Sequence, residues 1–87
     1  MRLKKAFIIH ETGEGAMLVP TGDAGFAGLV RGNRTLGAIL ELLKNDTSEA
    51  EMVSVLRARF DAPAEVIERD VRKALAELRR IGAVEET

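Results

Sequence analysis

The chain contains no cysteine. This absence excludes disulfides, thiolate metal sites and a thiol nucleophile, and it fits a reducing compartment. There is also no apolar run of about 18 residues, the length that a membrane-spanning helix needs. The apolar stretch at 6–9, which follows a basic start, is too short for the core of a signal peptide. We therefore expect a cytoplasmic protein without a membrane partner.

The chain also has no excess of positive or negative charge. Thirteen lysine and arginine residues face fourteen aspartate and glutamate residues, so the formal net charge is −1. No overall field attracts the protein to nucleic acid or to anionic lipid. A partner must therefore be recognised by a local surface.

The side chains that carry most enzyme chemistry are scarce. His10 is the only histidine, and no spacing supplies the convergent partners that a metal site or a nucleophilic relay needs. The glycines form no G-x-x-x-x-G-K-[ST] phosphate loop. The carboxylate pairs at 49/51 and 85/86 fall in solvated positions, without the burial that retunes a carboxylate for acid–base work. The sequence predicts a protein that is not an enzyme and has no metal site.

The order of residue types predicts the fold class. With 87 residues, one domain at 1–87 is expected. The first third is rich in β-branched, aromatic and glycine residues, whereas alanine, leucine, glutamate and arginine dominate after Thr35. Strands should therefore precede helices, as an α+β fold: a three-stranded antiparallel sheet followed by a three-helix, winged-helix-like bundle. The expected strands are 6–11, 16–20 and 26–31.

Three amphipathic stretches predict helices at 35–44, 48–60 and 64–81. Asn33 or Thr35 can cap the first helix. Ser48 and Glu51 have the spacing of a capping box at the start of the second. Gly82 should end the third. The expected buried faces are Leu36, Ile39, Leu40 and Leu43; Met52, Val53, Leu56 and Phe60; and Ile67, Val71, Ala74, Leu75 and Leu78.

Three helices with a β element also describe a winged-helix regulator, whose third helix would enter a major groove of DNA. The charges argue against nucleic acid, because carboxylates that phosphate would repel are interspersed with the basic residues of that helix. The same charges can form a solvated helix face with the i, i+4 pairs Glu65–Arg69, Glu68–Arg72 and Lys73–Glu77. The regulator stays the alternative hypothesis.

The third predicted strand is weakly protected against another chain. Its sequence, FAGLVR at 26–31, has a charge only at the last position and no proline. A short sheet leaves at least one edge with free N–H and C=O groups. Such an edge can aggregate, be covered by the protein, or accept an extended peptide as an added strand. Composition does not choose among these three outcomes.

Two blocks of the sequence resemble a known family. FAGLVRGNRTLGAILELL at 26–43 is similar to F-x-G-hydrophobic-x-x-L-N-x-T-G-x-x-I-W-x-L-L, and RDVRKALAELRRIGAV at 69–84 to D-V-x-x-F-L-x-x-L-x-x-x-G. KKAF at 4–7 and VPTGDA at 19–24 add to the likeness. The chain thus resembles the PqqD-like proteins, or RiPP recognition elements. It departs from them at Gly32, where the family usually has leucine, at Leu36, where it has glycine, and at Leu40, often a tryptophan. We expect the strand-to-helix corner to pack differently.

The resemblance implies a function as well as a fold. It implies a protein without a cofactor that captures the leader of a ribosomally made precursor peptide and presents it to a modifying enzyme, often a radical-SAM maturase. The leader would lie as an extra strand beside the third strand, in a groove walled by the third helix. A homodimer is left open. Backbone groups of the strand would set the register of the leader, and one side of the helix would select its side chains. The predicted peptide-binding residues are Ala27, Gly28, Leu29, Val30, Arg31, Val66, Asp70, Lys73, Ala74 and Glu77. Whether Asp70 contacts the leader or is structural is left open.

Overall fold

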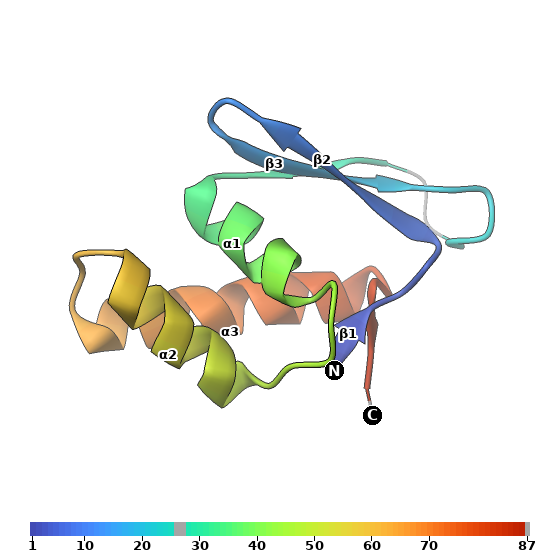
Figure 1. The fold of residues 1–87 in the computed structure, drawn as a ribbon. Coiled ribbons are helices and arrows are strands. Elements are labelled where there is room, and N and C mark those ends of the chain that lie inside the picture. The colour runs from blue at the N-terminus through green and yellow to red at the C-terminus, as the bar shows by residue number, and fades with distance from the viewer. Residues whose placement is uncertain (26–27, 87) are drawn as a thin grey trace.

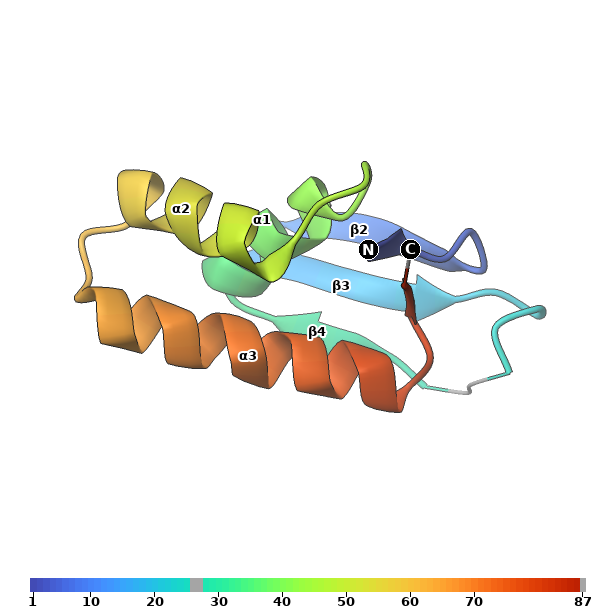
Figure 2. The ribbon, with the colours of Figure 1, turned by 90° about the horizontal axis from the view of Figure 1, so that it is seen from below.

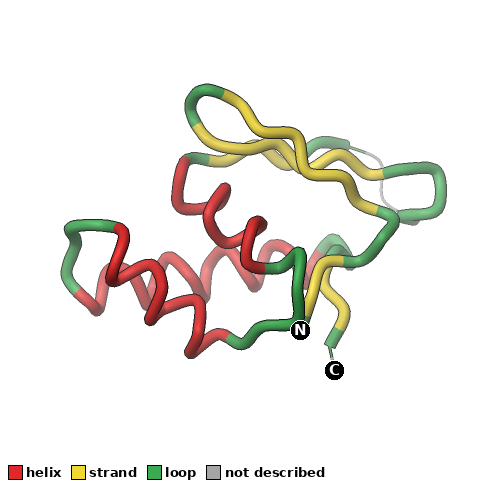
Figure 3. Tube along the Cα trace, viewed as in Figure 1, coloured by secondary structure: helices red, strands yellow, loops and turns green. Residues whose placement is uncertain are grey.

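A three-stranded antiparallel sheet is followed by three helices in this computed structural model, which describes residues 1–25 and 28–86. Figures 1 and 3 show the order of the elements. The elements are β2 (Phe7–Thr12), β3 (Gly15–Pro20), β4 (Val30–Gly32), α1 (Arg34–Leu42), α2 (Glu49–Arg59) and α3 (Ala64–Arg80). The predicted α+β class is confirmed. The first two predicted strands and all three predicted helices are present, and their ends lie within two residues of the predicted ones.

The third predicted strand is wrong in its extent. It was expected at 26–31, but β4 begins at Val30 and continues to Gly32. Positions 26 and 27 lie outside the described residues, and Gly28 and Leu29 precede the strand. Gly28 has a φ of 139°, a conformation that residues with a Cβ rarely adopt and that is incompatible with an extended strand. The glycine therefore delays the start of the strand.

The helices cover one face of the sheet, as Figure 1 shows. Side chains of β3 that point to this face, Ala16 and Leu18, are buried. Most residues of the predicted helix stripes are buried with them, although Leu36, Val53, Phe60 and Ala74 are only half-buried. Full burial of a leucine, isoleucine or methionine contributes about 1.5–3 kcal/mol. The fully buried large side chains are Leu18, Ile39, Leu40, Leu43, Met52, Leu56, Val71, Leu75 and Leu78.

Side chains cap the first two helices. The Oδ1 of Asn33 accepts a hydrogen bond from the Leu36 N–H at 3.2 Å, which decides between the two predicted caps of α1. The Oγ of Ser48 accepts from the Glu51 N–H at 3.1 Å. The Glu51 carboxylate accepts from the Thr47 hydroxyl at 3.2 Å, so only half of the predicted capping box forms. These bonds satisfy N–H groups that a helix start leaves without partners.

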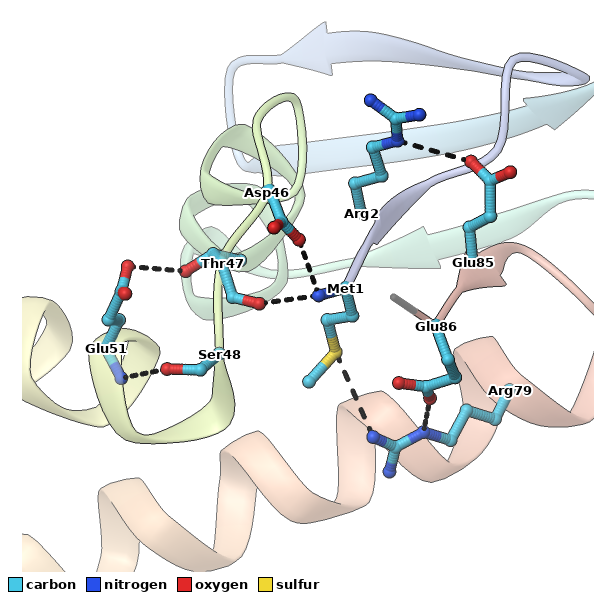
Figure 4. A network of polar contacts seen from close by, with 9 residues as sticks. All are labelled: Met1, Arg2, Asp46, Thr47, Ser48, Glu51, Arg79, Glu85 and Glu86. Carbon is cyan, nitrogen blue, oxygen red and sulfur yellow. Dashed lines mark hydrogen bonds and ion pairs between the residues drawn. The ribbon is translucent and has the colours of Figure 1, made fainter.

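The two ends of the chain are paired, which the sequence analysis did not predict. Strand β1 (Arg2–Leu3) lies antiparallel to β5 (Val84–Glu85). Figure 4 shows the N-terminal ammonium of Met1 against the Oδ1 of Asp46 at 2.8 Å and the carbonyl oxygen of Thr47 at 2.7 Å. These contacts join both ends of the chain to the connection between α1 and α2. Among the described helices, none is long and apolar enough to cross a membrane.

Candidate functional site

Strand β4 forms one of the two outer edges of the sheet. The strand order is β2-β3-β4, and within the described residues β4 pairs only with β3. Figure 2 shows α3 running alongside β4 beneath the sheet. A groove of about 350 Å³ lies between them. Its lining residues are Val30, Arg31, Gly32, Asn33, Thr35, Leu36, Asp70, Lys73, Ala74, Glu77 and Leu78.

The groove brings together most of the predicted site residues. Val30 and Arg31 line it from the strand, and Asp70, Lys73, Ala74 and Glu77 line it from α3. Their roles as peptide contacts stay predictions.

The other predicted site residues lie elsewhere. Val66 is half-buried near the start of α3 and does not line the groove. Gly28 and Leu29 line a separate hollow of about 660 Å³ beyond the end of β3. Ala27 lies outside the described residues. The groove is thus shifted along the chain relative to the predicted site, because β4 starts later than expected.

The sequence analysis missed the apolar floor of the groove. Leu36 and Leu78 contribute to the floor, and Leu36 packs against Gly32. A Cβ built on Gly32 would lie 2.2 Å from the Cδ2 of Leu36, so a larger residue at 32 and this leucine cannot share the space. The two departures from the family pattern, at 32 and 36, therefore belong together. Had the leucine and the glycine been treated as exchanged between these two positions, the sequence would have indicated that Leu36 contributes to the floor of the groove.

An ion pair within α3 occupies one carboxylate of the groove. The Glu77 carboxylate accepts hydrogen bonds from the Arg80 guanidinium, with Nε to Oε2 at 2.9 Å. These bonds hold the pKa of Glu77 below its ordinary value and raise the pKa of Arg80. None of the three predicted i, i+4 pairs forms. In particular, Lys73 makes no ion pair with a described residue.

Replacing Arg80 with glutamine should raise the pKa of Glu77 towards its ordinary value, because the hydrogen bonds that favour its charged form are lost. Because the pKa of Glu77 is lower in the folded protein than in the unfolded chain, its ion pair stabilises the fold at pH values above the ordinary pKa. This stabilisation is lost as the pH falls through the pKa of the folded state. The contribution is small because the pair is exposed. Carboxyl-carbon NMR titration measures the change. The matched control is Arg79→Gln, because the Nε of Arg79 contacts Glu86 at 2.8 Å; an equal shift in both variants would contradict the assignment.

The remaining candidate for chemistry, His10, lies exposed on β2 opposite Met17. In the part of the chain that the structure describes, no three histidine, aspartate or glutamate side chains gather to hold a metal ion. What the groove does offer is an open strand edge, an apolar floor and charged rims. This combination suits an extended peptide, whose backbone can pair with the edge while its side chains enter the groove.

Comparison with known proteins finds one matching family and two solved structures of similar fold. The model of the family described as coenzyme PQQ synthesis protein D (PqqD) matches residues 14–84. A structure described as TbiB1 in complex with the TbiA(beta) leader peptide has a TM-score of 0.81 and 18% identity, over 100% of this chain and 98% of that one. A lasso peptide synthetase B1 complexed with the leader peptide has a TM-score of 0.74 and 22% identity, over 98% and 96%. No curated protein matches the chain. At these identities the two structures establish a shared fold.

Proposed function

The chain belongs to the PqqD family, and from this premise we propose that it binds the leader of a ribosomally made precursor peptide and presents that leader to a modifying enzyme. The observation that carries the proposal is the open edge of β4, which faces α3 across a groove with an apolar floor. The two proteins of the same fold are described as complexes with leader peptides, which supports the same ligand class here.

The proposed mechanism is strand addition. The leader pairs with the backbone of Val30–Gly32, and the hydrogen bonds between the two backbones set its register. Leader side chains on the groove side meet Leu36 and the face of α3, where Asp70, Lys73, Ala74 and Glu77 discriminate among sequences. Gly28 and Leu29 would flank the paired segment at one end, and Val66 would lie beyond the groove.

The other parts of the proposal concern the partners. The protein itself carries out no reaction and needs no cofactor; a separate maturase, such as a radical-SAM enzyme, modifies the bound precursor. We place this activity in the cytoplasm, where a cysteine-free protein loses nothing to the reducing conditions. Capture by the groove would raise the concentration of the precursor beside the maturase and leave the segment to be modified free.

Amide hydrogen exchange tests strand addition directly. Successive N–H groups of a strand point to opposite sides, so either Arg31 or the pair Val30 and Gly32 faces away from β3. When a leader peptide that binds this protein is added, the outward-facing set should gain protection, because its donors enter a new ladder. The inner set should change less. NMR-detected exchange of the free and bound protein measures both sets.

The opposite edge of the same sheet is the internal control. β2 is also an outer strand, and its outward-facing amides should keep their exchange rates when the leader binds at β4. Protection confined to the starts of α2 and α3, especially with duplex DNA as the ligand, would contradict strand addition and favour the winged-helix regulator.

A further inference from the structure

The register of β4 determines where each side chain of an added strand would point. Val30 lies opposite the buried Leu18, and Gly32 lies opposite the buried Ala16, so both positions face the helices. Arg31 lies opposite Met17 on the other face. Paired residues of neighbouring strands share a face of the sheet. A peptide residue opposite Arg31 would therefore lie on the outer face, and its two neighbours would point into the groove.

The groove is apolar where those neighbours would enter. Gly32 contributes no side chain, and Leu36 packs against it from α1. Ala74 and Leu78 continue the apolar surface on α3. A peptide residue opposite Gly32 would meet Leu36 in place of a cross-strand side chain, so this position favours an apolar group. Burial of such a group is favourable in proportion to the apolar area removed from water.

The rims of the groove carry positive charge that is not engaged. Both carboxylates on the helix rim have a cationic neighbour: Glu77 is bound by Arg80, and the Oδ1 of Asp70 lies 4.0 Å from the Nε of Arg69. The two cations, Arg31 on the strand rim and Lys73 on the helix rim, form no ion pair with a described residue. Both are exposed. An anionic ligand would thus meet free positive charge on both sides.

We propose that the leader segment bound by this protein is acidic, with the order apolar, acidic, apolar over the three residues that pair with β4. The acidic residue lies opposite Arg31, and the apolar residues lie opposite Val30 and Gly32. Lys73 favours further negative charge on the helix side. The proposal rests on the proposed function, since it assumes that the leader adds to β4. It names the ligand chemistry that this particular groove selects.

The experiment uses random 15-residue peptides displayed on phage and selected on the full chain. Recovered peptides should be enriched in aspartate and glutamate over lysine and arginine, with the acidic residues between apolar ones. The variants Arg31→Glu and Lys73→Glu should each shift the preference towards basic peptides. One exposed ion pair contributes at most roughly fivefold to affinity. Each variant should lose more than this towards an acidic peptide, because repulsion replaces attraction.

Two exposed cations outside the groove supply matched controls. Lys5→Glu, just before β2, and Arg57→Glu, on α2, make the same charge change. Both should leave the acidic preference intact. If they reverse it as well, net charge decides the selection and the proposal is wrong.

The possible failures are distinguishable. Recovered peptides that protect the amides of β4 but show no acidic bias, or a bias that Arg31→Glu and Lys73→Glu leave unchanged, would overturn the proposed leader chemistry and keep strand addition. If none of the recovered peptides protects β4, strand addition itself fails, and the proposed leader chemistry fails with it. Thermal melts of each variant show that the comparison is made between folded proteins.

Discussion

Gly15→Ala is expected to lower the free energy of unfolding by about 3 kcal/mol, at the upper end of the usual cost of an inserted methyl group. A Cβ at Gly15 would lie 2.2 Å from the carbonyl oxygen of Gly32, and 2.5 and 2.6 Å from the carbonyl carbon and oxygen of Asn33. All three atoms are backbone, so no side-chain rotation relieves the contact. The end of β4 and the start of α1 must move instead.

Thermal and urea unfolding followed by circular dichroism measure this effect. For a chain of this size, the expected loss corresponds to a fall in Tm of more than about 10 °C. Gly13→Ala is the matched control in the same hairpin. A Cβ at Gly13 has no neighbour within 4 Å, so the free energy of unfolding of Gly13→Ala should differ from that of the unmodified protein by less than about 0.5 kcal/mol. Equal stability of the two variants would mean that the hairpin does not contact the corner between β4 and α1.

The same contact matters for the groove. Gly32 and Asn33 are lining residues, and Gly15 lies directly against their backbone. A shift of this corner would displace the edge with which the leader is proposed to pair. Any Gly15→Ala protein that remains folded should therefore also bind the leader more weakly than Gly13→Ala.

Ala74→Phe is expected to weaken leader binding by about 100-fold or more, which corresponds to about 2.7 kcal/mol. Ala74 is half-buried on α3 and lines the groove, which encloses about 350 Å³. A phenyl ring at this position would occupy the space that leader side chains need, while the open groove lets the ring avoid the core. Fluorescence anisotropy with a labelled leader peptide measures the affinity.

Ala76→Phe is the control for this experiment. Ala76 lies on the same helix, is exposed and does not line the groove, so the added ring changes composition but not the site. Its affinity for the leader should match that of the unmodified protein, and thermal melts should show both variants folded. Wild-type affinity in Ala74→Phe would place the leader outside this groove and refute the proposed site.

The comparison of sequence with structure is most informative at the groove. Four of the five predicted α3 residues, at 70, 73, 74 and 77, line the groove, because they share one face of any helix. Their contacts with a peptide stay predictions. On the strand side, the start of the third strand was predicted too early in the chain, because no sequence pattern reveals the Gly28 conformation that delays β4. The pairing of Lys73 with Glu77 was wrong because Arg80 reaches Glu77 from the next turn.

Interactions between residues that are close in the chain could be predicted without the structure. Helix positions, the caps at Asn33 and Ser48 and the buried stripes depend on residues within about one or two turns, and they followed from spacing alone. The features that join distant segments are set by the folded structure: the pairing of β1 with β5, the contact of Gly15 with Gly32, and the packing of α3 alongside β4. These depend on register and on the exact approach of backbones far apart in the chain. No local pattern encodes such distances. The resemblance to PqqD-like proteins implied a groove beside the third strand, but its floor and the stretch of strand that lines it were found only in the folded protein.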